Sequence, residues 1–542
     1  MLGLMMDWPL LISSLIRHAD RCHGDQEIVS RTVEGPIHRT TYRAAHSRAR
    51  KLANALAGLG VVPGEPVATL AWNGYRHFEL YYAVSGMGAI IHTINPRLFH
   101  DQLTHIVNHA EDRVAFFDLT FLPLVEKLSA SCPTVTTWIA LTDRAHMPES
   151  GLPNLLCYEE LLAAENDDFA WPTFDENTAA GLCYTSGTTG HPKGVLFSHR
   201  STVLHAMAVS LPDAKAYSAH SVILPIVPMF HVNAWGVPYS GPLTGAKIVF
   251  PGPGLDGKSL YELFESERVE SSAGVPTVWL GLIEYMRQNK LQFSTLKRTT
   301  IGGAACPPAM MQTLRDEFGV SVAHGWGMTE MSPVGTVGNL LPKHLKLPAD
   351  ERFALALKQG RPLYGVEMKI VDAEGRDLPR DGVATGNIMV KGPWVLRDYY
   401  KSGERSPLSG DGWFPTGDVG SIDADGLLEI TDRSKDVIKS GGEWISSIEL
   451  ENIAVGHPAV AEAAVIGVFH PKWNERPLLL VVKKQGAKVT RDDMLAFYEG
   501  KTARWSRPDD VVFVDELPHT ATGKLSKKAL RDRYKGYRLP GA

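Results

Sequence analysis

The chain has 542 residues, too many for one hydrophobic core, so we expect three or four folding units. Hydrophobic residues make up 44% and charged residues 21% of the sequence, which is typical of a globular protein. The net charge of -5 argues against a general nucleic-acid binder. Five cysteines without a C-x-x-C pair exclude a zinc knuckle and a disulfide scaffold, and we therefore expect a cytoplasmic protein.

The N-terminal segment is apolar, but it does not have the pattern of a membrane anchor. Asp7 and Pro9 interrupt it, and Arg17 closes it well short of the ~20 apolar residues that a membrane helix needs. We expect no membrane span, but a surface helix that packs on the body and contributes to a homodimer contact.

Short apolar runs alternate with helix-length amphipathic segments from about residue 67 to residue 329. This alternation is typical of parallel sheet in an α/β fold. The expected strands are Val67–Trp72, Val114–Phe117, Ser221–Ile226, Lys247–Phe250 and Val320–Ala323, and the expected helices include Tyr261–Glu267 and Pro308–Phe318.

Beyond about residue 360, short alternating runs are separated by turn residues, which indicates antiparallel β structure. Glu367–Val371 is expected to pair with Asn387–Lys391, and Trp413–Ile422 with Leu427–Thr431. We therefore predict a β-rich subdomain at about 360–432.

A compact α+β pattern follows Arg433. We predict an α/β fold class with α/β sheets over residues 1–432, a boundary at 433–436 and a small, mobile α+β domain over 437–542. The elements expected in this last domain are helix Ser447–Val455, strand Ala461–Val468, strand Pro477–Lys483, helix Arg491–Lys501 and strand Asp510–Phe513.

The strongest local signal is the loop Tyr184–Gly194, with the sequence YTSGTTGHPKG, after the apolar run Ala179–Cys183. Its hydroxyls and glycines offer O–H and backbone N–H donors that can wrap a polyphosphate, and Lys193 adds a mobile positive charge. The spacing is not that of a Walker A loop. By composition alone, a solvated turn accounts for these residues equally well.

The loop resembles the signature of the AMP-forming acyl-CoA synthetases, which belong to the adenylate-forming superfamily. Bacterial fatty-acyl-CoA synthetases and methylmercaptopropionate-CoA ligases are the most similar members. Seven motifs in the family's order span almost the whole chain, which is very hard to obtain by chance. The other six are Pro228–Trp235, Gly302–Ala305, Gly325–Glu330, Thr416–Asp418, Asp432–Trp444 and Pro518–Lys524.

The resemblance implies a ligase that activates a carboxylic acid with ATP to an acyl-adenylate and pyrophosphate. The acyl group is then transferred to coenzyme A, and AMP is released. Mg²⁺ is implied as the partner of ATP, bound by Thr185 and Glu330. Lys524 would stabilise the charge that develops during adenylation. His231 would lie near the carboxylate, as a fourth catalytic residue.

The resemblance also implies which residues bind the nucleotide. Trp326 would stack on adenine, Asp418 would accept hydrogen bonds from the ribose, and Arg433 would support Asp418. The complete predicted set is Thr185, Ser186, Gly187, Thr188, Thr189, Gly190, Lys193, Gly303, Ala304, Ala305, His324, Gly325, Trp326, Gly327, Met328, Thr329, Asp418, Arg433, Lys435 and Lys524.

Two domains follow from the same resemblance. Residues 1–432 would be the ATP- and acyl-binding domain, 433–436 the hinge and 437–542 a cap that rotates about Lys435. Rotation would withdraw Lys524 and bring a coenzyme A segment to the body, where glycines permit close approach. A simple glycine turn is the alternative. Lys527 and Lys528 are expected on an ordinary basic helix face. The predicted coenzyme A residues are Lys439, Ser440, Gly441, Gly442 and Trp444.

The acyl substrate is read from residues 228–247, which contain no acidic residue to pair an α-ammonium group. An apolar channel is expected there, for a short- or medium-chain, possibly thioether-containing carboxylate; a long-chain fatty acid is the alternative. Trp235 is a stopper, a gate or a core residue. The predicted acyl-binding residues are His231, Val232, Trp235, Gly302, Gly327 and Pro333.

Other functions share part of this pattern. A luciferase-like oxygenase would have the same adenylation motifs and would differ by consuming oxygen. A peptide-synthetase module needs carrier domains for which 542 residues leave no room. A non-catalytic nucleotide-binding regulator would tolerate loss of Lys524 and Glu330, and both are present. A serine hydrolase is disfavoured because no G-x-S-x-G occurs.

Overall fold

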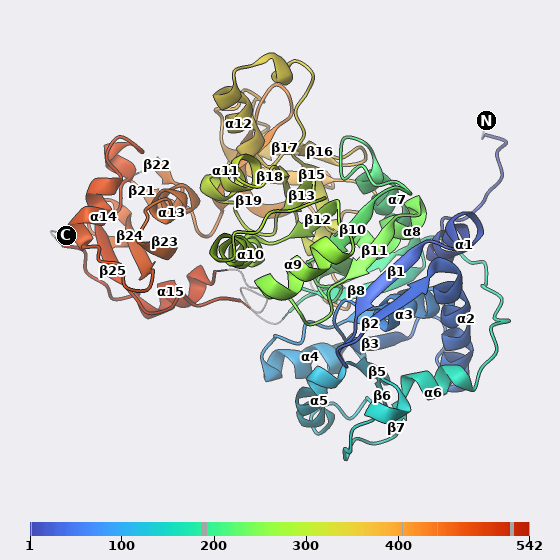
Figure 1. The fold of residues 1–542 in the computed structure, drawn as a ribbon. Coiled ribbons are helices and arrows are strands. Elements are labelled where there is room, and N and C mark those ends of the chain that lie inside the picture. Colours follow the sequence, from blue (N-terminus) through green and yellow to red (C-terminus); the bar gives the residue numbers. More distant parts are fainter. Residues whose placement is uncertain (2, 186–191, 404, 442, 521–524, 541–542) are drawn as a thin grey trace.

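The structure, a computed structural model, describes residues 1, 3–185, 192–403, 405–441, 443–520 and 525–540, except the side chain of Glu443. A large body and a smaller C-terminal lobe lie side by side (Figure 1). The described residues form three sheets in the body and a fourth in the lobe. This arrangement confirms the predicted fold class, with α/β sheets, a β-rich part and a separate α+β unit.

The first sheet has nine strands, and its centre is parallel from β14 to β1, while β15, β16 and β2 pair antiparallel at its ends. Helices α9 (Gly257–Ser266), α10 (Pro276–Gln288) and α11 (Pro308–Asp316) bury their apolar side chains against one face. In sheet order the strands are β16 (Arg361–Pro362), β15 (Val334–Val337), β14 (Ser321–Gly327), β13 (Arg298–Ile301), β12 (Ser271–Gly274), β10 (Val222–Pro225), β11 (Lys247–Phe250), β1 (Glu27–Arg31) and β2 (Ile37–Thr41).

The second sheet has seven strands, parallel except for β9. Helix α3 (Tyr75–Gly86) packs between the two sheets, and all its residues except Arg76 are buried. The strands in order are β7 (Leu155–Cys157), β6 (Thr137–Ala140), β5 (Val114–Phe117), β3 (Pro66–Leu70), β4 (Ile90–Thr93), β8 (Ala179–Tyr184) and β9 (Gly194–Ser198).

The remaining helices cover the outside of these two sheets. Helix α1 (Ile12–His23) packs on α2 and α8 through Ile12, Leu15 and Ile16, so the predicted surface helix is confirmed. Within the described part of the chain, no helix is long and apolar enough to span a membrane. The others are α2 (Tyr42–Gly58), α4 (His100–Ala110), α5 (Leu122–Ser129), α6 (Tyr158–Ala163), α7 (His199–Ser210), α8 (Val237–Thr244) and α12 (Ala349–Leu357).

The third sheet is the predicted β-rich part. It is an antiparallel meander of β17 (Glu367–Val371), β18 (Gly386–Lys391), β19 (Phe414–Ile422) and β20 (Leu428–Arg433), and both predicted hairpins form. Strand β20 leads directly into the C-terminal lobe (Figure 1). The lobe is therefore attached to the meander, not to the large sheets.

The lobe has its own sheet with helices on both faces. Helices α13 (Ser447–Val455) and α14 (Arg491–Phe497) pack on one face, and α15 (Lys527–Arg533) packs on the other. The prediction of an exposed basic face at Lys527 is wrong, because its ammonium is buried and forms a 2.8 Å ion pair with Glu451 of α13. The strands are β21 (Ile438–Ser440), β22 (Glu443–Ile445), β23 (Val460–His470), β24 (Asn474–Lys483) and β25 (Asp510–Phe513).

Candidate active site

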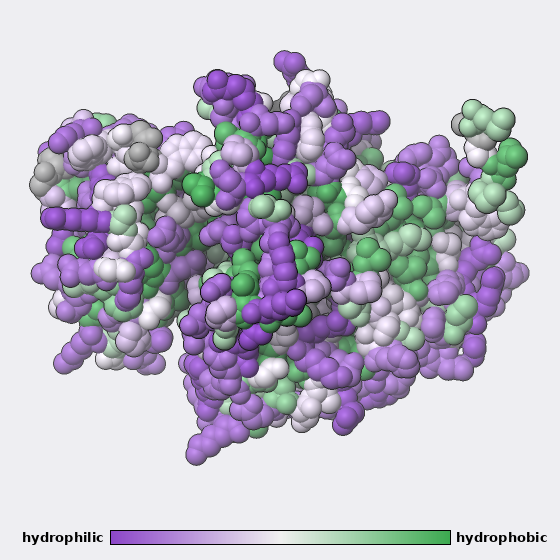
Figure 2. Space-filling model, turned by 90° about the horizontal axis from the view of Figure 1, so that it is seen from above, coloured by the Kyte–Doolittle hydropathy of each residue, from purple (hydrophilic) through white to green (hydrophobic). Residues whose placement is uncertain are grey.

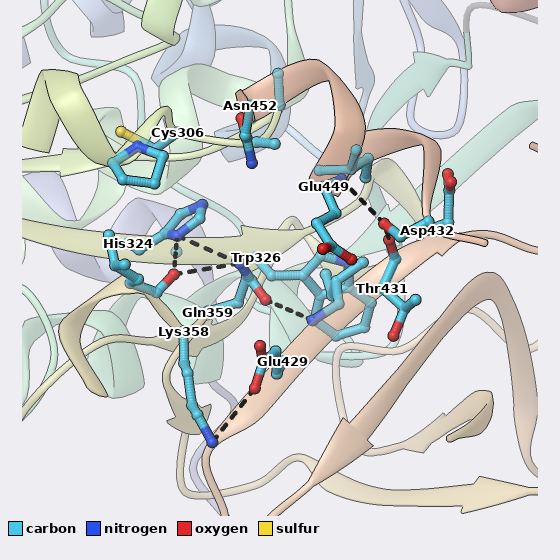
Figure 3. Close-up of a pocket in the computed structure, with 18 of the residues that line it drawn as sticks. Cys306, His324, Trp326, Lys358, Gln359, Glu429, Thr431, Asp432, Glu449 and Asn452 are labelled. Carbon is cyan, nitrogen blue, oxygen red and sulfur yellow. Dashed lines mark hydrogen bonds and ion pairs between the residues drawn. The ribbon is translucent and has the colours of Figure 1, made fainter. Parts of the chain in front are cut away.

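A cavity of about 830 Å³ lies where the nine-stranded sheet, the meander and helix α13 meet (Figure 3). The body contributes the turn after β13, the end of β14, and helix α12. Eight lining residues were predicted as nucleotide-binding from three separate motifs. They are Gly303, Ala304, Ala305, His324, Gly325, Trp326, Gly327 and Asp418, and Arg433 from a fourth motif joins them.

Asp418 is held from two directions at the wall of this cavity. Its Oδ2 accepts a 2.8 Å hydrogen bond from Nε1 of Trp326, and its Oδ1 lies 2.9 Å from Nε of Arg433. The paired strands β19 and β20 place Asp418 and Arg433 directly opposite each other. A carboxylate has about four lone-pair positions, so acceptor capacity is left for the hydroxyls of a ribose.

Trp326 has two functions in the structure. Its indole is 8% exposed and packs in a buried cluster with Met331 and Val334, yet it also lines the cavity. Its N–H group orients Asp418. The sequence predicted only the stacking role toward adenine, and the link to Asp418 has no signal in the sequence because the two residues belong to different sheets.

His324 lines the cavity two residues before Trp326 on β14, close to Gln359 (Figure 3). Burial lowers the pKa of His324, so the imidazole is neutral near pH 7. Its Nδ1 lies 2.8 Å from the carbonyl of Leu357, which requires the proton on Nδ1 and leaves Nε2 as the acceptor. Gln359, which sequence reasoning missed, also accepts a 2.6 Å hydrogen bond from the amide of Ile430 on β20.

The two ends of the predicted phosphate loop are pinned together. The amide of Thr185 donates to the carbonyl of Lys193 at 2.9 Å, and Oγ1 of Thr185 accepts from the amide of Lys193 at 3.2 Å. The predicted phosphate ligands between them, Ser186 to Gly190, lie outside the described residues.

Tyr399 links the phosphate loop to Glu330, and sequence reasoning missed it. Its hydroxyl donates to Oε1 of Glu330 at 2.9 Å, and Nζ of Lys193 lies 5.1 Å from the centre of its ring. Glu330 is buried, with 8% of its surface exposed. The structure thus brings Lys193 and Glu330 to one side of the site.

The donor set on this side is suited to Mg²⁺. One hydroxyl, Thr185, and one carboxylate, Glu330, are hard oxygen ligands, and Mg²⁺ in phosphate sites takes one or two protein ligands beside phosphate oxygens and water. The described residues contain no group of three or more His, Cys, Asp or Glu side chains that would form a metal cage by themselves. The residues therefore fit an ion that arrives with ATP.

The predicted acyl-binding residues form two contacting pairs. A Cβ atom built on Gly302 would lie 3.3 Å from Cη2 of Trp235, and one built on Gly327 would lie 2.0 Å from the carbonyl oxygen of Pro333. The backbone of Gly302 also approaches Gly325 closely, since the same Cβ would lie 2.5 Å from its oxygen. Side chains at these glycines would therefore displace the residues that are predicted to form the acyl site.

His231 and Val232 lead into the turn that carries Trp235. His231 is the residue before the turn η3 (Val232–Gly236) and is half-buried, while Val232 and Trp235 are buried. Residues 232 to 235 all have positive φ, between 46° and 56°. This left-handed geometry could not be predicted from the sequence, because none of the four residues is glycine.

The predicted coenzyme A residues that the structure describes, Lys439, Ser440, Gly441 and Trp444, belong to the lobe and do not line the 830 Å³ cavity. Lys439 and Ser440 lie on β21 and Trp444 on β22, with Gly441 at φ 60° in the connection between them. Trp444 is 40% exposed. Gly442 and the predicted catalytic Lys524 lie outside the described residues. Lys435 lies in the turn after β20, where burial lowers its pKa.

Helix α13 closes the cavity from the side of the lobe, which the sequence did not predict. Ser446, Ile448, Glu449 and Asn452 all line it (Figure 3). The docking contact is made by Asp432 at the end of β20, whose Oδ2 accepts a 2.7 Å hydrogen bond from the amide of Ser447. The nucleotide cavity is thus shared between body and lobe.

The profile of the AMP-binding enzyme family matches residues 16–400, and that of the AMP-binding enzyme C-terminal domain matches residues 449–524. The chain belongs to the AMP-binding enzyme family, which confirms the predicted resemblance.

Named relatives narrow the class further. The chain is 54% identical to a 3-methylmercaptopropionyl-CoA ligase of Ruegeria lacuscaerulensis, over 99% of both chains, and 51% identical to a medium-chain-fatty-acid–CoA ligase of Ectopseudomonas oleovorans, over 98% of both. The crystal structure of the anthranilate CoA ligase AuaEII with anthranoyl-AMP has the same fold, with a TM-score of 0.86 at 24% identity over 98% of both chains. The predicted enzyme class, an acid–CoA ligase, is confirmed.

Proposed function

We propose that this protein activates a short- or medium-chain carboxylate, including thioether-containing acids such as 3-methylmercaptopropionate, as its coenzyme A thioester. The observation that carries the substrate class is the contact of Trp235 with Gly302, which places an indole ring at the wall of an apolar site. Residues 228–247 contain no carboxylate to bind an amino acid. The 54% and 51% identical relatives act on acids of this size range, which supports the same class here.

In the first half-reaction the carboxylate attacks the α-phosphate of ATP and expels pyrophosphate. Asp418, oriented by Trp326 and Arg433, would hold the ribose. Thr185 and Glu330 would bind Mg²⁺, which supplies charge neutralisation at the phosphates. Lys524 would stabilise the charge on the pentacoordinate centre, and no general base is needed because a carboxylate is already ionised at pH 7.

The remaining contacts to the triphosphate and the acid follow from the same geometry. The loop 185–190 with Lys193 would cradle the β- and γ-phosphates, because its ends are closed by two hydrogen bonds. His231 would lie beside the carboxylate of the acid. Met328 and Thr329 connect the end of β14 to Glu330 and would complete the nucleotide wall.

In the second half-reaction the thiol of coenzyme A displaces AMP from the acyl-adenylate. We propose that the lobe rotates about 433–436, with Lys435 as the pivot, so that Lys439–Gly442 and Trp444 meet the body. The support is that α13 covers the nucleotide cavity while the hairpin β21–β22 lies away from it. One lobe would thus serve both half-reactions in turn.

A panel of carboxylates tests this function. Propionate, 3-methylmercaptopropionate, hexanoate, octanoate and palmitate are each incubated with ATP, Mg²⁺ and coenzyme A, and AMP and acyl-CoA are quantified. We expect stoichiometric AMP and thioester, with the highest kcat/KM between three and eight carbons. A maximum at palmitate would establish the long-chain alternative, and oxygen consumption without thioester would establish a luciferase-like enzyme.

We also propose that the protein functions as a cytoplasmic homodimer. The support is a set of apolar residues that project from the N-terminal segment in Figure 2, and five cysteines that form no disulfide. Light scattering on the full chain and on a variant lacking residues 1–8 tests the dimer, which the truncation should weaken. The projecting residues are Leu4, Met5, Met6 and Trp8.

The proposed requirement for Mg²⁺ has its own test. Chelation of Mg²⁺ should abolish AMP formation.

A further inference from the structure

Lys215 is a buried lysine that the reaction does not use. It lies in the turn between α7 and β10, and only 3% of it is exposed. Its Nζ donates a 2.9 Å hydrogen bond to the backbone carbonyl of Trp235. Among the described side chains no carboxylate pairs with it, whereas the half-buried Lys247 is paired with both Glu27 and Glu267.

Burying an ammonium without a carboxylate partner costs free energy, so the hydrogen bond to the carbonyl of Trp235 is its main compensation. Burial lowers the pKa of Lys215 to about 7, since desolvation penalises its charged form. The groups that face it are His205, whose pKa burial lowers to about 3, and Tyr217, whose pKa burial raises. Neither neutral group compensates the charge at pH 7.

The carbonyl that Lys215 binds belongs to a strained segment. Four successive residues without a glycine, 232 to 235, have left-handed φ values, and L-amino acids adopt such values rarely and as single residues. Such a turn persists only when its surroundings hold it. Side-chain contacts to the turn come from Tyr81, whose Oη lies 3.0 Å from Oδ1 of Asn233, and from Lys215, whose Nζ donates to the carbonyl of Trp235.

We propose that Lys215 is a positioning residue that sets acyl-chain selectivity, because it holds the left-handed turn that presses Trp235 against Gly302. The proposal rests on the proposed acyl site. His205 reinforces the same arrangement: its Nε2 accepts a 3.2 Å hydrogen bond from the amide of Val334, next to Pro333, and its ring lies 2.9 Å from where a Cβ on Gly236 would be. His205 on α7 and Lys215 in the turn after α7 therefore contact the two walls of the proposed acyl site, at Val334 and at Trp235.

Lys215→Met tests the proposal, because methionine keeps the length of the side chain and removes the donor. With the turn released, the indole no longer closes on Gly302 and longer acids gain room. We expect the ratio of kcat/KM for octanoate to that for propionate to rise about tenfold, the effect of one lost charge-assisted hydrogen bond. The KM for ATP should stay within about twofold, because no nucleotide ligand is touched.

Lys483→Met is the matched control, since Nζ of Lys483 also donates to a carbonyl, that of Val489 at 3.0 Å, but in the lobe. It should leave the ratio unchanged. Lys215→Gln keeps an N–H donor on a shorter chain and should give an intermediate ratio. If Lys215→Met does not fold, Lys215→Gln decides by itself.

Trp235→Ala separates failure of this proposal from failure of the acyl site. If Trp235→Ala shifts the ratio and a folded Lys215 variant leaves it within twofold of wild type, the positioning role is overturned while the acyl site stands. If Trp235→Ala also leaves the ratio unchanged, the acyl-site assignment falls and the role of Lys215 falls with it.

Discussion

The indole nitrogen of Trp326 donates a 2.8 Å hydrogen bond to Oδ2 of Asp418, 92 positions further along the chain. This contact joins the end of β14 in the large sheet to β19 in the meander. Because Arg433 holds the other oxygen, the carboxylate is oriented before any nucleotide arrives. The proposed ribose ligand is therefore preorganised by an aromatic residue whose expected partner was adenine.

Trp326→Phe should reveal this second role. Phenylalanine keeps an aromatic face for adenine but leaves Oδ2 of Asp418 without its donor. We expect the KM for ATP to rise by about tenfold, which corresponds to the loss of one hydrogen bond to a charged group. The change in kcat should be smaller. Steady-state AMP formation measures both. Trp413→Phe, outside the cavity, is the control, and an unchanged KM in Trp326→Phe would leave Trp326 as a stacking residue only.

Lys524→Ala should separate the two half-reactions. We expect adenylation to fall by about a hundredfold or more, the cost of removing one preorganised transition-state donor. Thioester formation from supplied acyl-adenylate should change little. Lys528→Ala, four positions away on an exposed part of α15, is the matched control and should be active in both assays. An equal loss in both half-reactions would contradict the role assigned to Lys524.

The sequence was informative wherever a pattern is local. Strands β11 and β17 have the predicted bounds, because each is a short apolar run between turn residues. Gln359, Tyr399 and helix α13 were missed as site residues, since they reach the cavity only through the packing of the meander and the lobe. Lys527 was misassigned because its burial depends on Glu451, 76 residues away and on another helix.

The proposed hinge at 433–436 leads to a third prediction. Proline at position 435 fixes φ near −65° and also restricts Ser434, so rotation about this point should be impaired. We expect Lys435→Pro to keep adenylation and to lose most thioester formation. Pyrophosphate release and acyl-CoA formation are measured separately on the same preparation. Normal steady-state ligase activity would contradict the rotation of the lobe.

The lowered pKa of Lys215 predicts that the free energy of unfolding depends on pH. Its folded pKa, about 7, is below its ordinary 10.5, so between pH 7 and 10.5 the unfolded chain binds more protons than the native one. The stability contributed by this group should therefore rise with pH in that window, by about 1.4 kcal/mol per pH unit, and be flat below pH 7. Melting temperatures of wild type and Lys215→Met from pH 6 to 9 test this.

The difference in melting temperature between wild type and Lys215→Met should change with pH in one direction. Methionine has no charge to desolvate, so Lys215→Met should be relatively most stable at or below pH 7, and the wild type should gain on it as pH rises. His205 is neutral in the native state throughout this range, because its pKa is about 3, and since both proteins contain it, its own contribution to the slope is shared by them. A constant gap between the two melting temperatures would mean that the ammonium of Lys215 is not desolvated.

We predict that Trp235 limits the length of the acyl chain. Its indole lies against Gly302 and only 7% of it is exposed, so Trp235→Ala should open the site toward longer acids. Each additional buried methylene contributes up to about 0.8 kcal/mol, roughly fourfold in kcat/KM per carbon. If the ring is instead a gate that ATP swings aside, long acids already react in the wild type, and the substitution removes the ATP dependence of their binding.

A purely structural Trp235 would behave differently from both. Its loss would cost about 3–5 kcal/mol of stability without changing chain-length preference. Measuring kcat/KM from propionate to palmitate for wild type and Trp235→Ala, together with acid binding with and without ATP, distinguishes stopper from gate. Melting temperatures of the same two proteins identify the third case: an unchanged profile with a lowered melting temperature would remove Trp235 from the substrate site, because the cavity it left would then lie outside the path of the acid.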